Sequence, residues 1–173
     1  MLRELRLDDG LAVSDGAGDK RVARFLIAVP SPYPLALARR WLQHRIDWWA
    51  EARGVTLAIV RRTQPRQLLG TASLRRFNRD RRAELGYWLA AGAWNFGFAT
   101  EACRAIVDFG FRELDLGRIY AQVLEGNAAS RHVLDKLGMT LEGTKRQHVR
   151  KGGKLHDVAL YGLLRDEWSA PAD

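Results

Sequence analysis

The chain has 173 residues, 47% of them hydrophobic, and a formal net charge of +8 at pH 7. This length suits one sizeable core and is too short for two ordinary domains, so we expect a single domain over residues 1–173. No apolar run approaches the ~20 residues that span a bilayer. The charged start of the chain also lacks the apolar stretch of a signal peptide, which predicts a cytoplasmic protein without a membrane partner.

The order of the predicted elements indicates the fold class. The front of the chain is predicted to form a strand near residues 2–7, helices near 19–28 and 34–52, and strands near 56–61, 67–76 and 82–89. A helix near 100–114, a strand near 118–124 and a helix near 128–137 follow. Strands near 139–150 and 155–164, joined by a hairpin turn at Gly152-Gly153, complete a mixed α+β sheet.

The stretch from Trp94 to Ala102 is the most informative. A strand that ends near Leu89 is followed by a loop containing Gly97 and then by a helix with Glu101 in its first turn. Free N–H groups at a helix start beside a glycine suit a phosphate or pyrophosphate, although the same pattern also occurs in ordinary turns. Neither a Gly-Lys-Ser/Thr sequence nor a three-glycine fingerprint is present, which disfavours an ATPase or a dehydrogenase.

A set of segments between Glu84 and Trp168 carries a family resemblance. It comprises Glu84-Leu85-Gly86-Tyr87-Trp88-Leu89, Gly97-Phe98-Ala99-Thr100-Glu101-Ala102, Asn127-Ala128-Ala129-Ser130, Leu137-Gly138-Met139 and His156-Asp157-Val158. The chain resembles the GNAT superfamily of acetyl-CoA-dependent N-acetyltransferases, most closely its Rim-type branch of ribosomal-protein N-terminal acetyltransferases. The resemblance implies a single-domain GNAT fold: a mixed, mostly antiparallel sheet of about seven strands, flanked by four helices, with the fourth and fifth strands splayed.

The resemblance also implies how acetyl-CoA, the cosubstrate, would be bound. Main-chain groups of one strand would hold the pantetheine arm and polarise the acetyl carbonyl, and the loop and helix start would bind the pyrophosphate. Asn127 would contact the coenzyme arm. The remaining cofactor-binding residues implied are Tyr87, Trp88, Leu89, Asn95, Phe96, Gly97, Phe98, Ala99, Thr100 and Ser130.

Two residues are the candidate catalysts. Ser130, one helical turn from Asn127, would donate a proton to the departing sulfur. Glu84 would take the proton of the acceptor amine through a water, with His148 and His156 as reserves. The residues alone leave other interpretations open: Asn127 as a helix cap, and Glu84 as the partner of a neighbouring arginine.

Some positions depart from the family pattern. Glycine is usual where Asn95 stands and a basic or polar residue where Phe96 stands, which alters one backbone contact to the pyrophosphate. Many relatives outside the Rim-type branch place a tyrosine acid at the position of Leu134, and some Rim-type members carry a carboxylate at that of Val149. These departures motivate one alternative, a non-catalytic acyl-CoA- or RNA-binding module.

The pKa values of the candidate acceptor amines indicate which class of acceptor is favoured. A protein α-amine has a pKa of about 7.7 to 8.0 and lysine about 10.4, so presenting a neutral lysine near pH 7 costs roughly 3 to 4 kcal/mol more. Because no strong base is evident, we expect a protein or peptide N-terminus, in the Rim-type pattern a ribosomal one. Polyamines and aminoglycosides are the small-molecule alternative, although a basic surface should repel such polycations.

Basic residues gather in two stretches. Residues 61–84 hold eight arginines against Asp80 and Glu84, a net +6, and a second basic run extends from Lys145 to Lys154. These stretches are either a solvated surface or a field that attracts coenzyme A or, weakly, RNA. A homodimer is compatible with the sequence, and no feature fixes the oligomeric state.

The potential metal and redox ligands indicate no further chemistry. Cys103, the only cysteine, falls on a predicted helix and is expected to be a buried structural thiol. The four histidines show no spacing typical of ligands, so no metal site is expected.

Overall fold

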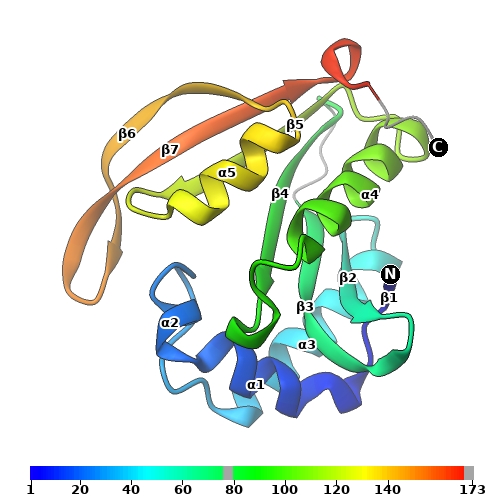
Figure 1. Cartoon of the computed structure of the whole chain (residues 1–173), viewed down its shortest axis with the longest axis vertical. Coiled ribbons are helices and arrows are strands. Elements are labelled where there is room, and N and C mark those ends of the chain that lie inside the picture. Colours follow the sequence, from blue (N-terminus) through cyan, green and yellow to red (C-terminus); the bar gives the residue numbers. More distant parts are fainter. Residues whose placement is uncertain (76–79, 170–173) are drawn as a thin grey trace.

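The structure, a computed structural model, describes residues 1–75 and 80–169. Within these residues one seven-stranded sheet has the order β1-β2-β3-β4-β5-β7-β6 (Figure 1). Neighbouring strands are antiparallel except β4 and β5, which run parallel. This is the predicted mixed sheet. Its strands are Leu2–Glu4 (β1), Gly54–Arg61 (β2), Gln64–Arg75 (β3), Arg82–Leu89 (β4), Arg118–Leu124 (β5), Thr140–Lys151 (β6) and Lys154–Leu164 (β7).

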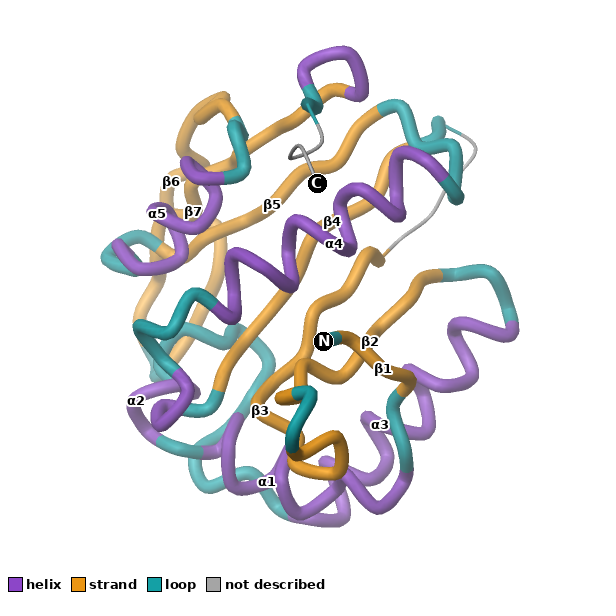
Figure 2. Tube along the Cα trace, turned by 45° about the vertical axis from the view of Figure 1, so that its right-hand side comes forward, coloured by secondary structure: helices purple, strands orange, loops and turns teal. Residues whose placement is uncertain are grey.

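Helices cover both faces of the sheet. Alternate residues of β2 show this: Ile59 packs into the core beneath α4 and α5, whereas Ala58 and Val60 pack into a second core with α1 and α3. Figure 2 shows α4 lying across the strands. In the described part of the chain no helix is long and apolar enough to cross a membrane. The helices are Gly10–Gly18 (α1), Lys20–Ala23 (α2), Leu35–Ala50 (α3), Phe98–Arg112 (α4) and Ala128–Lys136 (α5).

Two predictions for the front of the chain are wrong. The helix expected near residues 19–28 ends at Ala23, and α1 was not expected at all. Its glycines resemble a loop in the sequence, but they permit close packing: a Cβ on Gly16 would fall 2.9 Å from the Trp88 ring, and one on Gly18 would fall 2.8 Å from the Tyr33 nitrogen. Tertiary packing thus overrides the low helix propensity of glycine.

The parallel pair β4–β5 separates along its length. Its register runs from Arg82 opposite Arg118 to Leu85 opposite Ala121. Beyond that point β4 continues to Leu89 and β5 to Leu124 without pairing to each other. The predicted splay is therefore present, and it begins at Gly86. The predicted hairpin turn is present too, because Gly152 and Gly153 both have positive φ between β6 and β7.

Candidate active site

The start of α4 has the geometry of an anion site. Gly97 is the N-cap residue, with φ +80°, and its carbonyl accepts the first helical hydrogen bond from Glu101 N at 3.0 Å. The N–H groups of Phe98, Ala99 and Thr100 therefore have no intrahelical acceptor and lie at the positive end of the helix dipole. A Cβ on Gly97 would meet nothing within 4 Å, so the left-handed backbone, rather than crowding, requires glycine.

Asn95 and Phe96, the two residues before Gly97, depart from the family pattern and form part of this loop. Asn95 has φ +65°, a conformation that glycine adopts freely and asparagine tolerates better than most residues. Phe96 is 65% exposed, and its ring lies 5.9 Å from that of Phe98. The guanidinium of Arg61, at the end of β2, lies 5.5 Å from the Phe98 ring. Arg61 adds positive charge beside the helix start, and no local sequence signal links it to this loop.

A hydrogen-bonded pair joins β4 to α5. Tyr87 Oη donates to the carbonyl oxygen of Ser130 at 3.0 Å and lies 2.8 Å from Ser130 Oγ. In the second contact either hydroxyl can be the donor. Burial raises the pKa of Tyr87 far above its ordinary value, so the phenol stays protonated. Sequence reasoning had assigned Tyr87 a role only through its main chain.

The neighbours of this pair are structural. Asn127 Oδ1 accepts from Ser130 N at 3.2 Å, which makes Asn127 the N-cap of α5, the alternative that the residues left open. Leu134 is fully buried in the core, so this position cannot present a group to a ligand. Cys103 is fully buried as well, and burial raises the pKa of its thiol, which confirms the structural role expected of it.

Glu84 lies on the opposite face of β4 from Tyr87, because side chains alternate along a strand. It is 6% exposed, and its Oε1 accepts from Arg75 Nη2 at 3.1 Å. The guanidinium of Arg75 also rests on Gly86, where a Cβ would fall 2.8 Å from Nη2. The arginine pairing that the sequence left open is therefore present. The side chain of Glu84 therefore lies on one face of β4, and Ser130 contacts Tyr87 on the other face.

The reserve histidines have other surroundings. His148 is exposed on β6. His156 Nε2 lies 3.2 Å from the carbonyl oxygen of Lys151, and the adjacent Asp157 accepts from Gln147 N at 2.7 Å. His156 and Asp157 therefore each stabilise part of the β6–β7 hairpin. Among residues 1–75 and 80–169, no group of three or more His, Cys, Asp or Glu side chains is placed to hold a metal ion.

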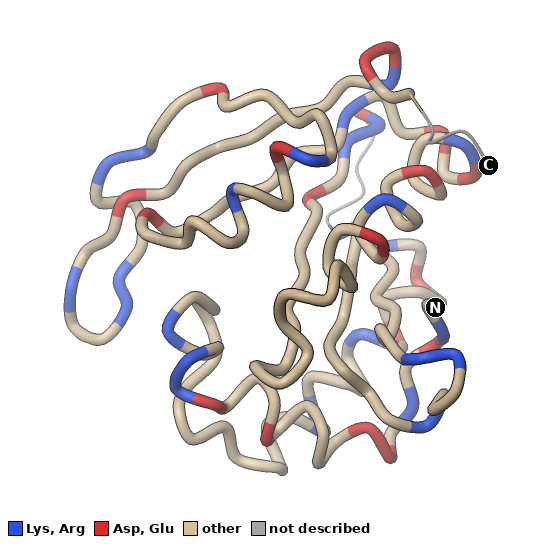
Figure 3. Tube along the Cα trace, viewed as in Figure 1, with Lys and Arg blue, Asp and Glu red and all other residues tan. Residues whose placement is uncertain are grey.

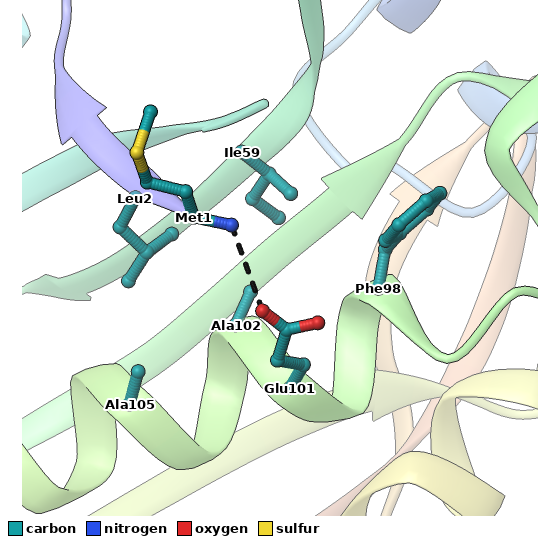
Figure 4. Close-up of a pocket in the computed structure, with 7 residues that line it drawn as sticks. All are labelled: Met1, Leu2, Ile59, Phe98, Glu101, Ala102 and Ala105. Carbon is teal, nitrogen blue, oxygen red and sulfur yellow. Dashed lines mark ion pairs between the residues drawn. The ribbon is translucent and has the colours of Figure 1, made fainter. Parts of the chain in front are cut away.

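A small cavity of about 50 Å³ lies between the first turns of α4 and strands β1 and β2 (Figure 4). The ammonium of Met1 lies 3.6 Å from Glu101 Oε1 and neutralises the only carboxylate in the lining. The cavity has room for a few water molecules and none for a coenzyme arm. Its lining residues are Met1, Leu2, Ile59, Phe98, Glu101, Ala102 and Ala105.

The seven-stranded sheet and the splay of β4 from β5 agree with comparisons to known proteins. The acetyltransferase (GNAT) domain model matches residues 1–140, so the chain belongs to the GNAT acetyltransferase family. YoaA of Bacillus subtilis, an uncharacterized N-acetyltransferase, is 36% identical over 166 residues, which are 95% of this chain and 93% of YoaA. The protein is accordingly an acetyl-CoA-dependent N-acetyltransferase.

The chain is also similar to proteins whose names indicate ribosomal or Rim-type acetyltransferases. YdaF of Bacillus subtilis, provisionally named a ribosomal N-acetyltransferase, is 33% identical over 126 residues, 70% of this chain and 67% of YdaF. The structure of Mycobacterium smegmatis RimJ, in complex with a CoA-disulfide, aligns with a TM-score of 0.86 at 22% identity. That alignment covers 99% of this chain and 84% of RimJ, and at this identity it shows a shared fold.

Proposed function

We propose that the protein acetylates the α-amino group at a polypeptide N-terminus, with a ribosomal protein as the natural acceptor. The observation that carries this is the charge on the α3 side of β4, where Arg75 pairs with Glu84 and Arg45 lies within electrostatic reach of both. Such a cluster repels the polycationic polyamines and aminoglycosides. An α-amine has a pKa of about 7.7 to 8.0 and needs no strong base to lose its proton. The name given to YdaF supports the same acceptor class.

The binding of the donor uses the chain's main-chain groups. Acetyl-CoA supplies an acetyl group already activated as a thioester, so the protein has only to hold it, stabilise the oxyanion and move protons. The N–H groups of residues 98–100 bind the pyrophosphate at the positive end of α4, with Arg61 nearby. The unpaired edge of β4, at Tyr87, Trp88 and Leu89, binds the pantetheine arm and directs an N–H group at the acetyl carbonyl.

Proton transfer is divided between the two faces of β4. On the α3 side, Glu84 takes the proton of the attacking amine through a water. On the α5 side, the Ser130 hydroxyl donates its proton to the sulfur as the C–S bond breaks. Ser130 then regains a proton from solvent, to which Glu84 releases the proton of the amine. Tyr87 positions Ser130 through its 3.0 Å and 2.8 Å contacts. The neutral amine attacks directly, so no covalent nucleophile is needed.

A panel of acceptors tests the proposed function. Thiol release from acetyl-CoA is measured with peptides that have free Ser, Ala, Thr or Met N-termini, and with N-terminally blocked lysine peptides, spermidine and an aminoglycoside. We expect turnover only on the free N-termini, because their amines have a far larger neutral fraction near pH 7 than lysine amines have. Efficient acetylation of spermidine or the aminoglycoside would reassign the acceptor. Coenzyme binding without transfer to any acceptor would favour the non-catalytic alternative.

Replacing Ser130 with alanine is expected to lower kcat by about tenfold to a hundredfold, between the loss of one hydrogen bond and that of a full general acid. Steady-state kinetics at saturating acetyl-CoA and calorimetric titration of coenzyme A measure the two effects separately. Tyr87→Phe is the matched control: it keeps the serine hydroxyl, loses only the positioning contacts, and should cost less. Unchanged turnover of the Ser130 variant with intact coenzyme binding would remove the acid assignment.

A further inference from the structure

Two arginines converge where β4 parts from β5. Arg75, the last residue of β3, lays its guanidinium over Gly86, where a Cβ would fall 2.8 Å from Nη2. Gly86 is the first residue of β4 beyond the paired segment that ends at Leu85. The Arg75 guanidinium therefore stands on the α3 side of the sheet, beside the opening between the two strands.

Arg45, on α3, is the second arginine. Its guanidinium lies 4.1 Å from the Trp48 ring and 5.6 Å from the Trp41 ring, so two indoles flank it. Burial and, secondly, the charge of Arg75 lower the pKa of Arg45 to about 10, so the two guanidinium groups lie within electrostatic reach of each other. The interaction of Arg45 with Glu84 opposes these effects only in part.

Each guanidinium group has one buried N–H donor that makes no hydrogen bond among the described residues. These donors are Arg45 Nη1 and Arg75 Nε. A buried donor without an acceptor is costly, and a guanidinium fork matches the two oxygens of a carboxylate. Since Arg45 and Arg75 face Glu84 alone in this cluster as described, the cluster retains excess positive charge. A carboxylate from outside would supply the acceptors and offset that charge.

The tip of the β6–β7 hairpin and the segment beside it form a basic rim. Lys151, at the tip of the β6–β7 hairpin, donates through Nζ to the carbonyl oxygens of Leu26 at 2.6 Å and Val29 at 3.3 Å. The hairpin tip and the segment after α2 are thereby held together, and Figure 3 shows basic residues on both. An acidic acceptor would be attracted to this rim. The exposed basic residues on it are Lys20, Arg21, Arg24, Arg150 and Lys154.

We propose that Arg45 and Arg75 bind a carboxylate carried by the acceptor close to its amine, so that the preferred acceptors are polypeptide N-termini followed by Asp or Glu. This inference rests on the proposed N-terminal acetyltransferase activity. It adds a preference for substrates with a negative charge near the amine. Glu84 faces the amine and the arginines face the carboxylate. The pair thereby selects the acceptor, and the proton transfers stay with Glu84 and Ser130.

Three peptides that differ only at the second residue give the first test: Ser-Glu, Ser-Gln and Ser-Lys starts on an otherwise neutral peptide. We expect kcat/KM to be about tenfold or more higher for Ser-Glu than for Ser-Gln, mainly through KM, and lowest for Ser-Lys. Raising the salt concentration should reduce the part of this preference that arises from the exposed rim. Free glutamate is a fourth acceptor, which separates a peptide carboxylate from that of a small amino acid.

Arg45→Gln gives the second test. It should remove most of the Ser-Glu preference, so that kcat/KM falls more for Ser-Glu than for Ser-Gln, because only the acidic acceptor brings a carboxylate to the guanidinium. Arg53→Gln is the matched control: Arg53 also lies over Trp48, at 5.4 Å, but it is exposed and pairs with Glu51, so its loss should leave the preference unchanged. Arg45→Lys keeps the charge without the fork and should be intermediate.

The outcomes separate this inference from the proposed function. Equal turnover of all three peptides would overturn the carboxylate site and leave N-terminal acetylation standing. Turnover of free glutamate, lost in Arg45→Gln and absent with every peptide, would retain the carboxylate site and overturn the peptide acceptor. If no acceptor turns over, tryptophan fluorescence decides: quenching by the Ser-Glu peptide in the presence of coenzyme A, abolished in Arg45→Gln, supports the site, and no response overturns it.

Discussion

Glutamine in place of Glu84 is expected to lower kcat by about a hundredfold or more with a neutral N-terminal peptide, because the amine would lose the group that takes its proton. Glutamine keeps the size of the side chain and an oxygen that can accept from Arg75, 3.1 Å away in the unaltered protein. The measurement is kcat and its pH profile with the Ser-Gln peptide. The profile should change, and a variant that retains the profile would exclude Glu84 as the base.

The ion pair with Arg75 offers a control for structural damage. If Glu84 served only to neutralise Arg75, the Glu84→Gln and Arg75→Gln variants would lose similar activity. If Glu84 is the base, Glu84→Gln should be far the more damaging on kcat, although both break the same buried pair and lower the thermal unfolding temperature. Melting curves recorded beside the kinetics separate the two causes.

Alanine at Gly70 is expected to lower the free energy of unfolding by about 3 kcal/mol. Gly70 lies opposite Leu89 in the β3–β4 ladder, and an added Cβ would overlap the carbonyl oxygen of Trp88 and come within 2.8 Å of the Leu89 Cα. Both obstacles are backbone, so the two strands would have to move apart. Urea denaturation of the two proteins measures the change.

Gly92→Ala is the matched control for Gly70. A Cβ on Gly92 meets nothing within 4 Å, and its φ is not positive, so this substitution should be close to neutral. A Gly70→Ala protein as stable as the unaltered one would show that β3 and β4 can separate without cost. In the expected case coenzyme binding should weaken as well, because the displaced residues Trp88 and Leu89 belong to the edge proposed to hold the pantetheine arm.

The elements that form the proposed donor site were predictable from the sequence. The boundaries of β4 and β5 are those expected, and α4 begins at Phe98, two residues before the predicted start. The sequence carries local signals for them: an aromatic-rich run in β4, helical periodicity in α4, and a glycine at the left-handed N-cap of α4. Of the basic stretch between residues 61 and 84, Arg76 and Arg79 lie outside the described residues.

The contacts across the fold were not predictable. The Tyr87–Ser130 hydrogen bond joins residues 43 positions apart, and it depends on which face of β4 meets α5. The approach of Arg45 to Arg75 likewise requires α3 to lie on the other face. Helix α1 was missed because local propensity weighs Gly16 against a helix, whereas its contact with Trp88 favours the small residue.

Because the junction between β4 and β5 is short, bound acetyl-CoA would also stabilise the sheet. Only four residue pairs join these strands in the described structure, so the antiparallel half formed by β1 to β4 meets the β5–β7–β6 half over a narrow seam. A pantetheine arm bound in the opening beyond this seam would bridge the two strands where they do not pair and make the sheet continuous. A ligand that binds only the folded chain adds about 2.7 kcal/mol of stability at a hundred times its Kd. The supply of acetyl-CoA would thus govern how long the enzyme survives as well as how fast it works.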